Sequence, residues 1–387
     1  MIYLDNSATS CPKPAEVVEA VRHALVEVCA SPGRGAYDTA LEAGRIMLRA
    51  RRAVARLFGI GEEARVIFTL NATEALNLAL KGMLVDGGHV ITSSLEHNAV
   101  VRPLAALARY GVEVTRVPCA ADGTTDPADV LAAVRPDTRL VVLTHASNVL
   151  GTLMPIELVG PALRARGVPF LVDAAQTAGS FPIDVESACI DLLAVPGHKG
   201  LLGPQGVGVL YVGPGVRPRP LMEGGTGGDS ESLDPPKELP ERYEPGTPNL
   251  PGVAGLAAGV GVVLARGVEE IGVRERALAN RLKAGAMEIA GVHCYGPPHG
   301  VPAAPVVSVA FEGLASAEAA FVLDRGFGIA VRSGLHCCPE AHRVAGTLEN
   351  GLVRLSIGHA NTEADIDQAL EAFRAITAQL HEGGSWS

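Results

Sequence analysis

Short runs rich in β-branched residues alternate with amphipathic stretches between residues 65 and 212. This alternation is typical of a parallel sheet whose strands are joined by crossover helices. The predicted strands are Arg65 to Leu70, His89 to Ser93, Glu113 to Val117, Arg139 to Thr144, Pro169 to Asp173, Leu192 to Val195 and Val207 to Val212. Helices are expected at Thr39 to Phe58, Thr73 to Lys81, Asn98 to Arg109, Pro127 to Val134 and Ile156 to Arg166. The pattern predicts a large α/β domain with a mainly parallel, seven-stranded sheet.

The alternation stops at a passage rich in glycine and proline, Gly213 to Gly252, which predicts loop. Beyond it the expected elements are helices Val253 to Ala265 and Glu269 to Ala290, strand Val306 to Phe311, helix Ser316 to Asp324, strands Gly328 to Arg332 and Leu352 to Ile357, and helix Glu363 to Leu380. We therefore expect a large domain over residues 15–252 and a smaller C-terminal α+β domain over 253–387. Residues 1–14 are expected to pack near the smaller domain.

Composition and charge narrow the class of protein. Of the 387 residues, 48% are hydrophobic and 19% are charged, which excludes a disordered chain. The net charge is -10 and no basic run occurs, so nucleic acid and anionic membranes are poor partners. No apolar stretch reaches the roughly 20 residues that span a bilayer, and the N-terminus lacks the features of a signal peptide. We expect a cytoplasmic protein.

Cysteine usage agrees with that location. The chain has 7 cysteines, an odd number, and none shows C-x-x-C spacing. Free thiols in a reducing compartment fit this usage better than a disulfide framework or a structural zinc site. No metal site is predicted.

One lysine has an unusual setting. Lysine occurs only at Lys13, Lys81, Lys199, Lys237 and Lys283. Lys199 lies at the end of an apolar run and is surrounded by glycines, within Ala194 to Gly206. A lysine held beside a buried strand, rather than on a solvated helix face, is the type that loses its proton and forms Schiff bases.

Other predicted strands also end in polar residues, where open α/β sheets bind ligands. Asp173 is either a helix N-cap or the partner of a protonated ring nitrogen. Thr73 starts a helix, where it caps the helix, binds phosphate or does both. His97 is either structural or stacks on a planar ring, and Asn148 can donate to a ring oxygen or a carboxylate. With Lys199, the set describes a site for pyridoxal 5′-phosphate (PLP), whereas the dinucleotide and Walker glycine motifs are missing from the sequence.

With these motifs, the chain resembles the cysteine desulfurases of the class V aminotransferase group, which are fold-type I PLP-dependent enzymes. The resemblance runs nearly end to end. Its matching segments are Tyr3 to Thr9, Ala72 to Glu74, Glu96 to His97, Ser147 to Gly151, Val172 to Gln176, Gly197 to Lys199, Gly246 to Asn249 and Arg332 to Cys337.

The resemblance implies a role for each matched residue. Lys199 would bond to the cofactor and act as the Cα base. Asp173 would pair with the pyridinium nitrogen, His97 would stack on the ring, and Gln176 would lie beside the phenolic oxygen. The other implied cofactor residues are Ala72, Thr73, Asn148 and His198, with Thr247 reaching the phosphate of the partner subunit's site. That last role implies a homodimer.

The C-terminal region bears on the reaction. Cys337 matches the family's sulfur-accepting cysteine, although most free cysteines are inert, buried residues. The adjacent His336 and nearby arginines are expected to raise its thiolate fraction. Arg354, on a predicted strand, is either an exposed edge residue or the clamp for the substrate carboxylate, which the resemblance favours, together with Asn148 and Arg332. The implied reaction converts L-cysteine to L-alanine and leaves a persulfide on Cys337, for transfer to an acceptor protein or a small thiol.

The chain also departs from the family pattern. Pro196 stands where many members have a phosphate-binding serine, and Leu335 where group II members often have a second histidine. The glycine-rich run 223–228 resembles a desulfurase-like branch, and the short stretch from Cys337 to Arg354 resembles group II, whose short loop implies slow turnover without an acceptor. Alternative reactions are those of a selenocysteine lyase, a cysteine sulfinate desulfinase or a cystine C–S β-lyase. A class V aminotransferase or a non-catalytic sulfur-transfer scaffold also remains open.

Overall fold

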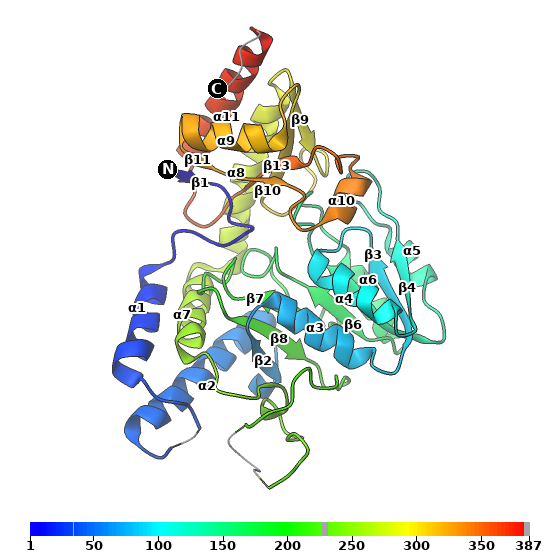
Figure 1. Ribbon diagram of the computed structural model, residues 1–387, viewed down its shortest axis with the longest axis vertical. Helices are drawn as coiled ribbons and strands as arrows, with labels where there is room; N and C mark the ends of the chain where they lie inside the picture. Colours follow the sequence, from blue (N-terminus) through cyan, green and yellow to red (C-terminus); the bar gives the residue numbers. More distant parts are fainter. Residues whose placement is uncertain (34, 227–230, 383–387) are drawn as a thin grey trace.

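A seven-stranded sheet occupies the lower part of the molecule in Figure 1. The computed structural model describes residues 1–33, 35–226 and 231–382, so residues 227 and 228 of the glycine-rich run lie outside the described residues. The strand order is β2-β8-β7-β6-β5-β3-β4, and β8 pairs antiparallel with β2 and β7 whereas the other neighbouring strands of this sheet pair in parallel. The strands are β2 (Val66–Thr69), β3 (Gly88–Ser93), β4 (Val112–Val117), β5 (Thr138–Thr144), β6 (Phe170–Asp173), β7 (Leu192–Pro196) and β8 (Gly208–Val212). The predicted α/β fold with a mainly parallel sheet is confirmed.

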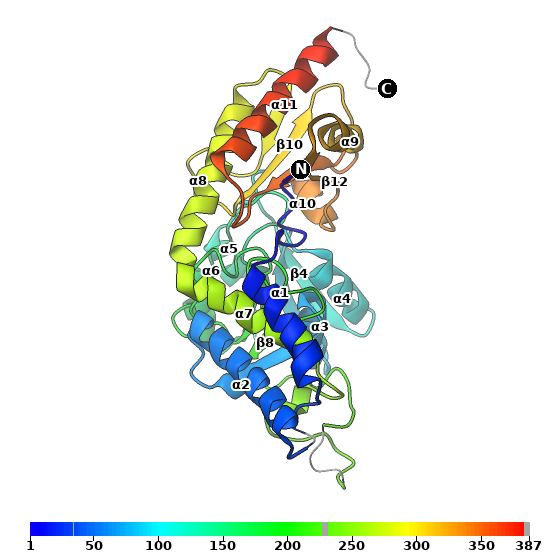
Figure 2. The ribbon, with the colours of Figure 1, turned by 90° about the vertical axis from the view of Figure 1, so that its left-hand side faces the viewer.

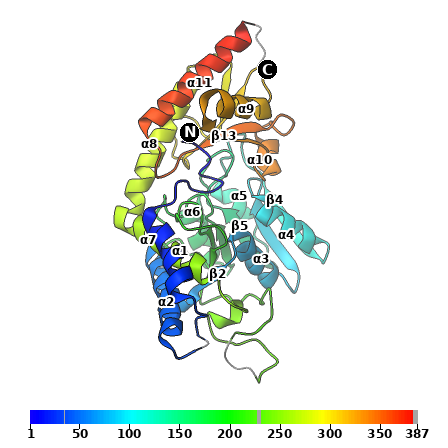
Figure 3. The same cartoon turned by 60° about the vertical axis from the view of Figure 1, so that its left-hand side comes forward.

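Helices cover both faces of this sheet, because successive strand residues point to opposite sides. Leu171 packs on one side with α3 (Ala72–Met83) and α4 (Asn98–Ala108). The next residue, Val172, packs on the other face of the sheet, where α2 (Asp38–Phe58), α6 (Ile156–Arg164) and α7 (Leu250–Arg266) lie. In Figure 3, α2 and α7 lie to the left of the sheet and α3 and α4 to its right. Helix α1 (Ala15–His23), which was not predicted, packs on α7, and α5 (Pro127–Ala132) packs on α6.

A second, four-stranded antiparallel sheet lies above the first in Figure 1, in the order β12-β13-β10-β9. Its strands are β9 (Val292–Tyr295), β10 (Val306–Phe311), β12 (Arg332–Gly334) and β13 (Leu352–Ser356). The helices around it are α8 (Val268–Met287), α9 (Ser316–Phe327), α10 (Pro339–Val344) and α11 (Glu363–His381). Phe311 and Phe373 meet edge to face in its core, with ring centroids 5.1 Å apart.

The N-terminal segment joins this second part of the chain. Strand β1 (Ile2–Tyr3) pairs in parallel with β11 (Ile329–Ala330). The single strand predicted from Gly328 to Arg332 is therefore wrong, because its residues divide between two sheets, β11 with β1 and β12 with β13. Val331 lies between these strands.

The proposed division into residues 15–252 and 253–387 stays a prediction, and α7 and α8 connect the two cores (Figure 2). Val253 and Val260 of α7 pack with the large sheet, whereas Leu282 of α8 packs with the small one. The helices meet at Gly267, which has a φ of 86°, and cross at 82°. In the described part of the chain no single helix is long and apolar enough to cross a membrane, and α7 and α8 pass that test only when taken together as a bent pair.

Candidate active site

All of the predicted cofactor residues except Thr247 line one cavity at the carboxyl ends of β5, β6 and β7. Its empty volume is about 520 Å³. The predicted residues that line it are Ala72, Thr73, His97, Asn148, Asp173, Gln176, His198 and Lys199. The parallel strands bring these side chains together from distant parts of the sequence, at the edge where open α/β sheets bind ligands.

Lys199 and Asp173 lie on neighbouring strand ends of this cavity. Burial lowers the pKa of Lys199 to about 8, an effect that the Asp173 carboxylate opposes. Asp173 ends β6 and is buried, and its Oδ1 accepts a hydrogen bond of 2.9 Å from the N–H of Ala175. Burial also raises the pKa of Asp173, while that hydrogen bond and Lys199 lower it. Near neutral pH, Lys199 is therefore an uncharged amine in a fraction of the molecules. The positive charge of Lys199 then offsets only part of the cost of burying the Asp173 carboxylate.

His97 lies where β3 leads into α4. Its Nδ1 accepts a hydrogen bond of 3.0 Å from the N–H of Ala99, so the ring caps the helix. Burial is the first cause that lowers the pKa of His97 to about 4, and the positive charges of Lys199 and Arg332 add to it. The ring is thus neutral near pH 7, with its Nδ1 as an acceptor, and it lines the cavity.

The start of α3 supplies N–H groups to the same cavity. Asn71 is the N-cap, since its side chain accepts a hydrogen bond of 2.9 Å from the N–H of Glu74. The reading of Thr73 as the N-cap is therefore wrong. Ala72 and Thr73 occupy the first two helical positions, whose N–H groups have no partner within a helix. The helix dipole favours an anion at this place.

His198 precedes Lys199 and ties the N-terminal segment to the site. Its carbonyl oxygen accepts hydrogen bonds from the Ser10 N–H at 3.0 Å and from Nζ of Lys13 at 2.8 Å. Its ring Nδ1 is buried without a hydrogen-bond partner among the described residues. Burial and then the charge of Lys199 lower the pKa of His198 to about 4. No local sequence pattern indicates the contribution of this segment, which depends on long-range contacts.

Gln176 extends from the turn after β6, at the edge of the same cavity. Its side-chain nitrogen donates a hydrogen bond of 3.4 Å to the carbonyl oxygen of Ser7, another contact with the N-terminal segment. Pro196, one of the departures from the family pattern, is the last residue of β7 and also lines the cavity.

Arg354 is a fully buried arginine on β13, not an exposed edge residue. Its Nη2 lies 2.7 Å from Oδ1 of Asp5, and its Nη1 donates a hydrogen bond of 3.1 Å to the carbonyl oxygen of Asn148. Its Nε has no hydrogen-bond partner among the described residues, so one buried donor remains available. The Asp5 contact was not predicted.

The loop that carries Cys337 is fixed by contacts of its backbone. His336 and Cys337 both have left-handed backbone angles, with φ of 52° and 58°. The His336 carbonyl oxygen accepts a hydrogen bond of 2.7 Å from Asn148, and that of Cys337 accepts one of 2.9 Å from the N–H of Asn98. Cys337 itself is exposed, and Nη2 of Arg332 lies 3.2 Å from its sulfur. The loop thus holds the thiol next to the start of α4, beside His97.

His336 does not act as the expected cationic neighbour of Cys337. Its side chain is buried, and burial lowers its pKa to about 3. Its ring contacts the ring of His342, with Nδ1 and Nε2 3.3 Å apart. The positive charge beside the thiol comes from Arg332 instead. Sequence reasoning could not distinguish a buried histidine from an exposed one at this position.

Cys338 differs from its neighbour in exposure. Its sulfur is buried and lies 3.2 Å from the carbonyl oxygen of Glu96. Burial raises the pKa of the Cys338 thiol to about 12, so it stays protonated near neutral pH. Cys337 is thus the accessible thiol of the pair.

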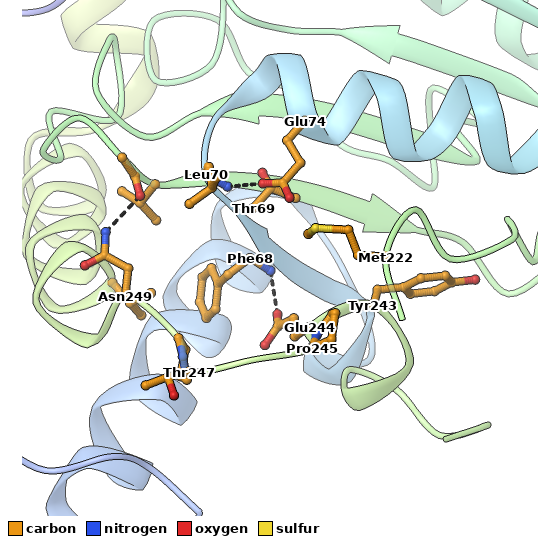
Figure 4. A pocket seen from close by; sticks show the side chains of 14 residues that line it. Phe68, Thr69, Leu70, Glu74, Met222, Tyr243, Glu244, Pro245, Thr247 and Asn249 are labelled. Carbon is orange, nitrogen blue, oxygen red and sulfur yellow. Dashed lines mark hydrogen bonds between the residues drawn. The ribbon is translucent and has the colours of Figure 1, made fainter. Parts of the chain in front are cut away.

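Thr247 lies outside this cavity, exposed at a separate pocket that Figure 4 shows. Phe68 and Glu244 line the same pocket, and Glu244 accepts a hydrogen bond of 2.5 Å from the Phe68 N–H. Glu244 also forms an ion pair with Arg51. Within one subunit, the fold therefore does not bring Thr247 to the other predicted residues.

The chain belongs to the aminotransferase class-V family, whose sequence model matches residues 2–369. Within this family, its relatives carry the names of cysteine desulfurases. It is 35% identical over 97% of its length to a probable cysteine desulfurase of Methanothermobacter thermautotrophicus, of which it covers 94%. It is 34% identical over 98% of its length to the cysteine desulfurase IscS of Methanosarcina thermophila, of which it covers 92%.

Solved structures of cysteine desulfurases have the same fold as this chain. The fold matches that of a cysteine desulfurase from Thermococcus onnurineus with a TM-score of 0.92 and 33% identity, over 97% of this chain and 94% of that one. It also matches the cysteine desulfurase CsdA of Escherichia coli with a TM-score of 0.88 and 27% identity, over 98% of this chain and 94% of that one. The family predicted from the motifs is confirmed.

Proposed function

We propose that this protein is a PLP-dependent cysteine desulfurase, which converts L-cysteine to L-alanine and takes the sulfur as a persulfide on Cys337. The observation that carries the proposal is the setting of Cys337. Its exposed sulfur lies 3.2 Å from the Arg332 guanidinium, in a loop bonded to the start of the helix that His97 caps. An aminotransferase has no need of such a thiol, and the match to cysteine desulfurases supports the choice.

The residues of the cavity fit PLP. Asp173 is a buried carboxyl group with a raised pKa, which a protonated pyridine nitrogen would compensate. The buried Nδ1 of His198 has no partner among the described residues, and the first N–H groups of α3 suit a phosphate. When bound, PLP withdraws electrons from the substrate Cα, which makes the Cα proton acidic.

Each side chain then has a task. Lys199 would hold the cofactor, and its free amine would take the Cα proton, for which a pKa of about 8 is suited. The neutral ring of His97, Gln176, Ala72, Thr73 and His198 line the same cavity and would hold the cofactor's ring and phosphate, with no contribution from Pro196 to the phosphate.

The substrate carboxylate is bound by Arg354, whose buried Nε is free of partners among the described residues. Asp5 holds the opposite part of the guanidinium in place through its contact of 2.7 Å. Asn148 joins the two sites, because it contacts both Arg354 and the Cys337 loop. Arg332 adds positive charge between the substrate and the thiol.

The sulfur moves in one displacement. The Cys337 thiolate attacks the substrate sulfur, a sulfur–sulfur bond forms, and the bond between Cβ and sulfur breaks. The electron pair stays on the carbon side, which gains protons to become alanine. The Arg332 guanidinium lies 3.2 Å from the sulfur that makes this attack.

Two further features belong to the proposal. Thr247, exposed at its own pocket, is assigned to the phosphate of the partner subunit's site, which makes the enzyme a homodimer. The free cysteines of the described chain fit a cytoplasmic location, where thiols stay reduced.

The test is to incubate the PLP-loaded protein with L-cysteine and a reductant, and to measure alanine and sulfide. The matched pair of variants is Cys337→Ser and Cys29→Ser, since both cysteines are exposed and both have positive φ, 58° and 42°. Cys29→Ser should keep the wild-type rate, and Cys337→Ser should lose it. No alanine from the wild type contradicts the proposal, as does a keto acid in its place. Full activity of Cys337→Ser points to selenocysteine lyase or β-lyase chemistry, and protein that takes up no PLP points to a scaffold.

A further inference from the structure

A groove runs from Cys337 along the outer side of α3 and α4. Its empty volume, part of which is open to solvent, is about 740 Å³. It shares Thr73 and His97 with the cavity at the strand ends, so the two spaces adjoin. Cys337 lines the groove but not that cavity. A molecule in the groove would meet the thiol from the side of the solvent.

The groove presents two cations on matching helix faces. Asn77 and Lys81 are one turn apart on α3, and Asn98 and Arg102 are one turn apart on α4, so each pair shares a face of its helix. All four residues line the groove, and Lys81 and Arg102 are exposed. The resulting site has four polar side chains, two of which are positively charged.

These charges stand out against the rest of the chain. The net charge of the protein is -10, yet none of the described residues that line the groove is acidic. No described carboxylate forms an ion pair with Lys81 or Arg102. The field of Arg102 also reaches the cavity, since its charge contributes to the low pKa of His97. The groove therefore attracts an anion toward Cys337.

We infer that this groove binds a small anionic thiol, which removes the sulfur from Cys337. This inference rests on the proposed desulfurase function. The carboxylate or sulfonate of the thiol lies against Lys81 and Arg102, and its sulfur points to Cys337. Its thiolate attacks the outer sulfur of the Cys337 persulfide, the sulfur–sulfur bond breaks, and Cys337 leaves as a thiolate. The acceptor gains the persulfide, so no oxidant or reductant is consumed.

The substrate itself does not account for the groove. The carboxylate of an amino acid has its own buried partner in Arg354, which is not among the groove residues. Lys81 and Arg102 come from the outer parts of α3 and α4, beyond Thr73 and His97. The two cations are therefore available to a second, anionic ligand.

The first experiment needs no turnover. Cys337 is alkylated with iodoacetate, an anion, and with iodoacetamide, its neutral analogue, and the modified peptide is quantified by mass spectrometry. Lys81→Met and Arg102→Met should each lower the ratio of the iodoacetate rate to the iodoacetamide rate by about two- to fivefold, and the double variant by roughly tenfold. Added salt should reduce the ratio in the wild type. Arg109→Met, at an exposed arginine of the C-terminal end of α4 outside the groove, is the matched control and should leave it unchanged.

The second experiment measures alanine release from L-cysteine with 2-mercaptoethanesulfonate and with 2-mercaptoethanol, which share a two-carbon chain but differ in charge. The ratio of kcat/KM for the anionic thiol to that for the neutral thiol should fall in Lys81→Met and Arg102→Met, and stay constant in Arg109→Met. If wild-type protein releases no alanine with either thiol, the proposed function fails, and the alkylation ratios still judge the groove. The inference is overturned if both thiols are used but Lys81→Met and Arg102→Met leave the alkylation ratio and the kcat/KM ratio unchanged. It is also overturned if these variants slow the reactions of both thiols equally.

Discussion

Nε2 of His342 lies 3.3 Å from Nδ1 of His336, and this hydrogen bond has a single possible direction. The other nitrogen of His336, Nε2, lies 3.2 Å from the carbonyl oxygen of Arg332, which can only accept. In its neutral form His336 must therefore donate from Nε2 and accept at Nδ1, so His342 is the donor between the rings. Nδ1 of His342 then accepts from the hydroxyl of Thr347 at 2.9 Å.

This chain of hydrogen bonds predicts that His342 positions the Cys337 loop. His342→Leu leaves Nδ1 of His336 buried without a donor, and should lower the free energy of unfolding by about 1–3 kcal/mol. The alkylation rate of Cys337 should change with it, because His336 precedes the cysteine and holds the Arg332 backbone. His342→Gln, which keeps a side-chain donor, should retain more of both properties. Urea unfolding and alkylation kinetics check this, and a His342→Leu variant like the wild type in both would contradict it.

The low pKa of Lys199 predicts the pH dependence of cofactor attachment. A lysine with a pKa of about 8 is the uncharged nucleophile above that pH, so covalent uptake of PLP by cofactor-free protein should rise with a midpoint near 8. The Asp173 carboxylate raises the pKa of Lys199, so Asp173→Asn should move the midpoint to lower pH. Borohydride trapping at a series of pH values measures both. A midpoint at the ordinary lysine value of 10.5 would refute the burial argument.

The contact between Asp5 and Arg354 predicts a stability difference between a buried and an exposed ion pair. Asp5→Ala leaves a fully buried guanidinium without its countercharge and should cost about 3 kcal/mol or more of unfolding free energy. Arg281→Ala removes an ion pair with Asp367 whose side chains are 47% and 48% exposed, and should cost less than about 1 kcal/mol. Urea unfolding of both variants is the measurement. Equal losses of unfolding free energy in the two variants would mean that the Asp5 carboxylate does not offset the cost of burying the Arg354 charge.

Alanine substitutions at two glycines of α7 are expected to have opposite effects on the free energy of unfolding. A Cβ at Gly259 would lie 2.3 Å from the carbonyl oxygen of Leu201, in the turn after Lys199, whereas a Cβ at Gly261 would meet nothing within 4 Å. Gly259→Ala should therefore cost about 1–3 kcal/mol by forcing the helix away from that turn. Gly261→Ala should stabilise the helix by up to about 1 kcal/mol. Thermal unfolding and PLP retention would show whether the close approach of α7 supports the lysine turn.

The fixed Cys337 loop predicts slow turnover without an acceptor. Asn98, Asn148 and Arg332 all bond to this short loop, which limits the reach of its thiol. Wild-type protein given L-cysteine alone should release about one alanine per site and then stall, and added thiol should restore turnover. Rapid quench with alanine quantification would reveal the burst. Fast, steady turnover without thiol would contradict the constraint.

The large sheet and its polar strand ends were predictable from sequence because both depend on local patterns. Asp173 and Lys199 follow apolar runs, and a parallel sheet brings such ends to one edge whatever the details of packing. Strand β9 was missed because Val292–Tyr295 is short and mixed in character, so only pairing with β10 fixes it as a strand. Tertiary context decides such segments.

The contacts that orient the site were less predictable. Asp5 and Arg354 are 349 positions apart, and no local pattern couples a residue near one end of the chain to a strand near the other. His336 shows a different limit, since its residue type suggested a cation while its burial makes it neutral. Burial of a single polar side chain depends on how its loop folds, which periodicity does not record.

The pairing of the N-terminal segment with β11 and β13 also sets an order for biosynthesis. Asp5 leaves the ribosome long before Arg354, and at about 5–20 residues per second the interval is roughly 20 to 70 seconds. During that time Asp5 and Ser7 have no counterpart from β13 to fold against. The substrate pocket is thus completed only when translation has passed β13, so a nascent chain can form the large sheet well before it can bind an amino acid.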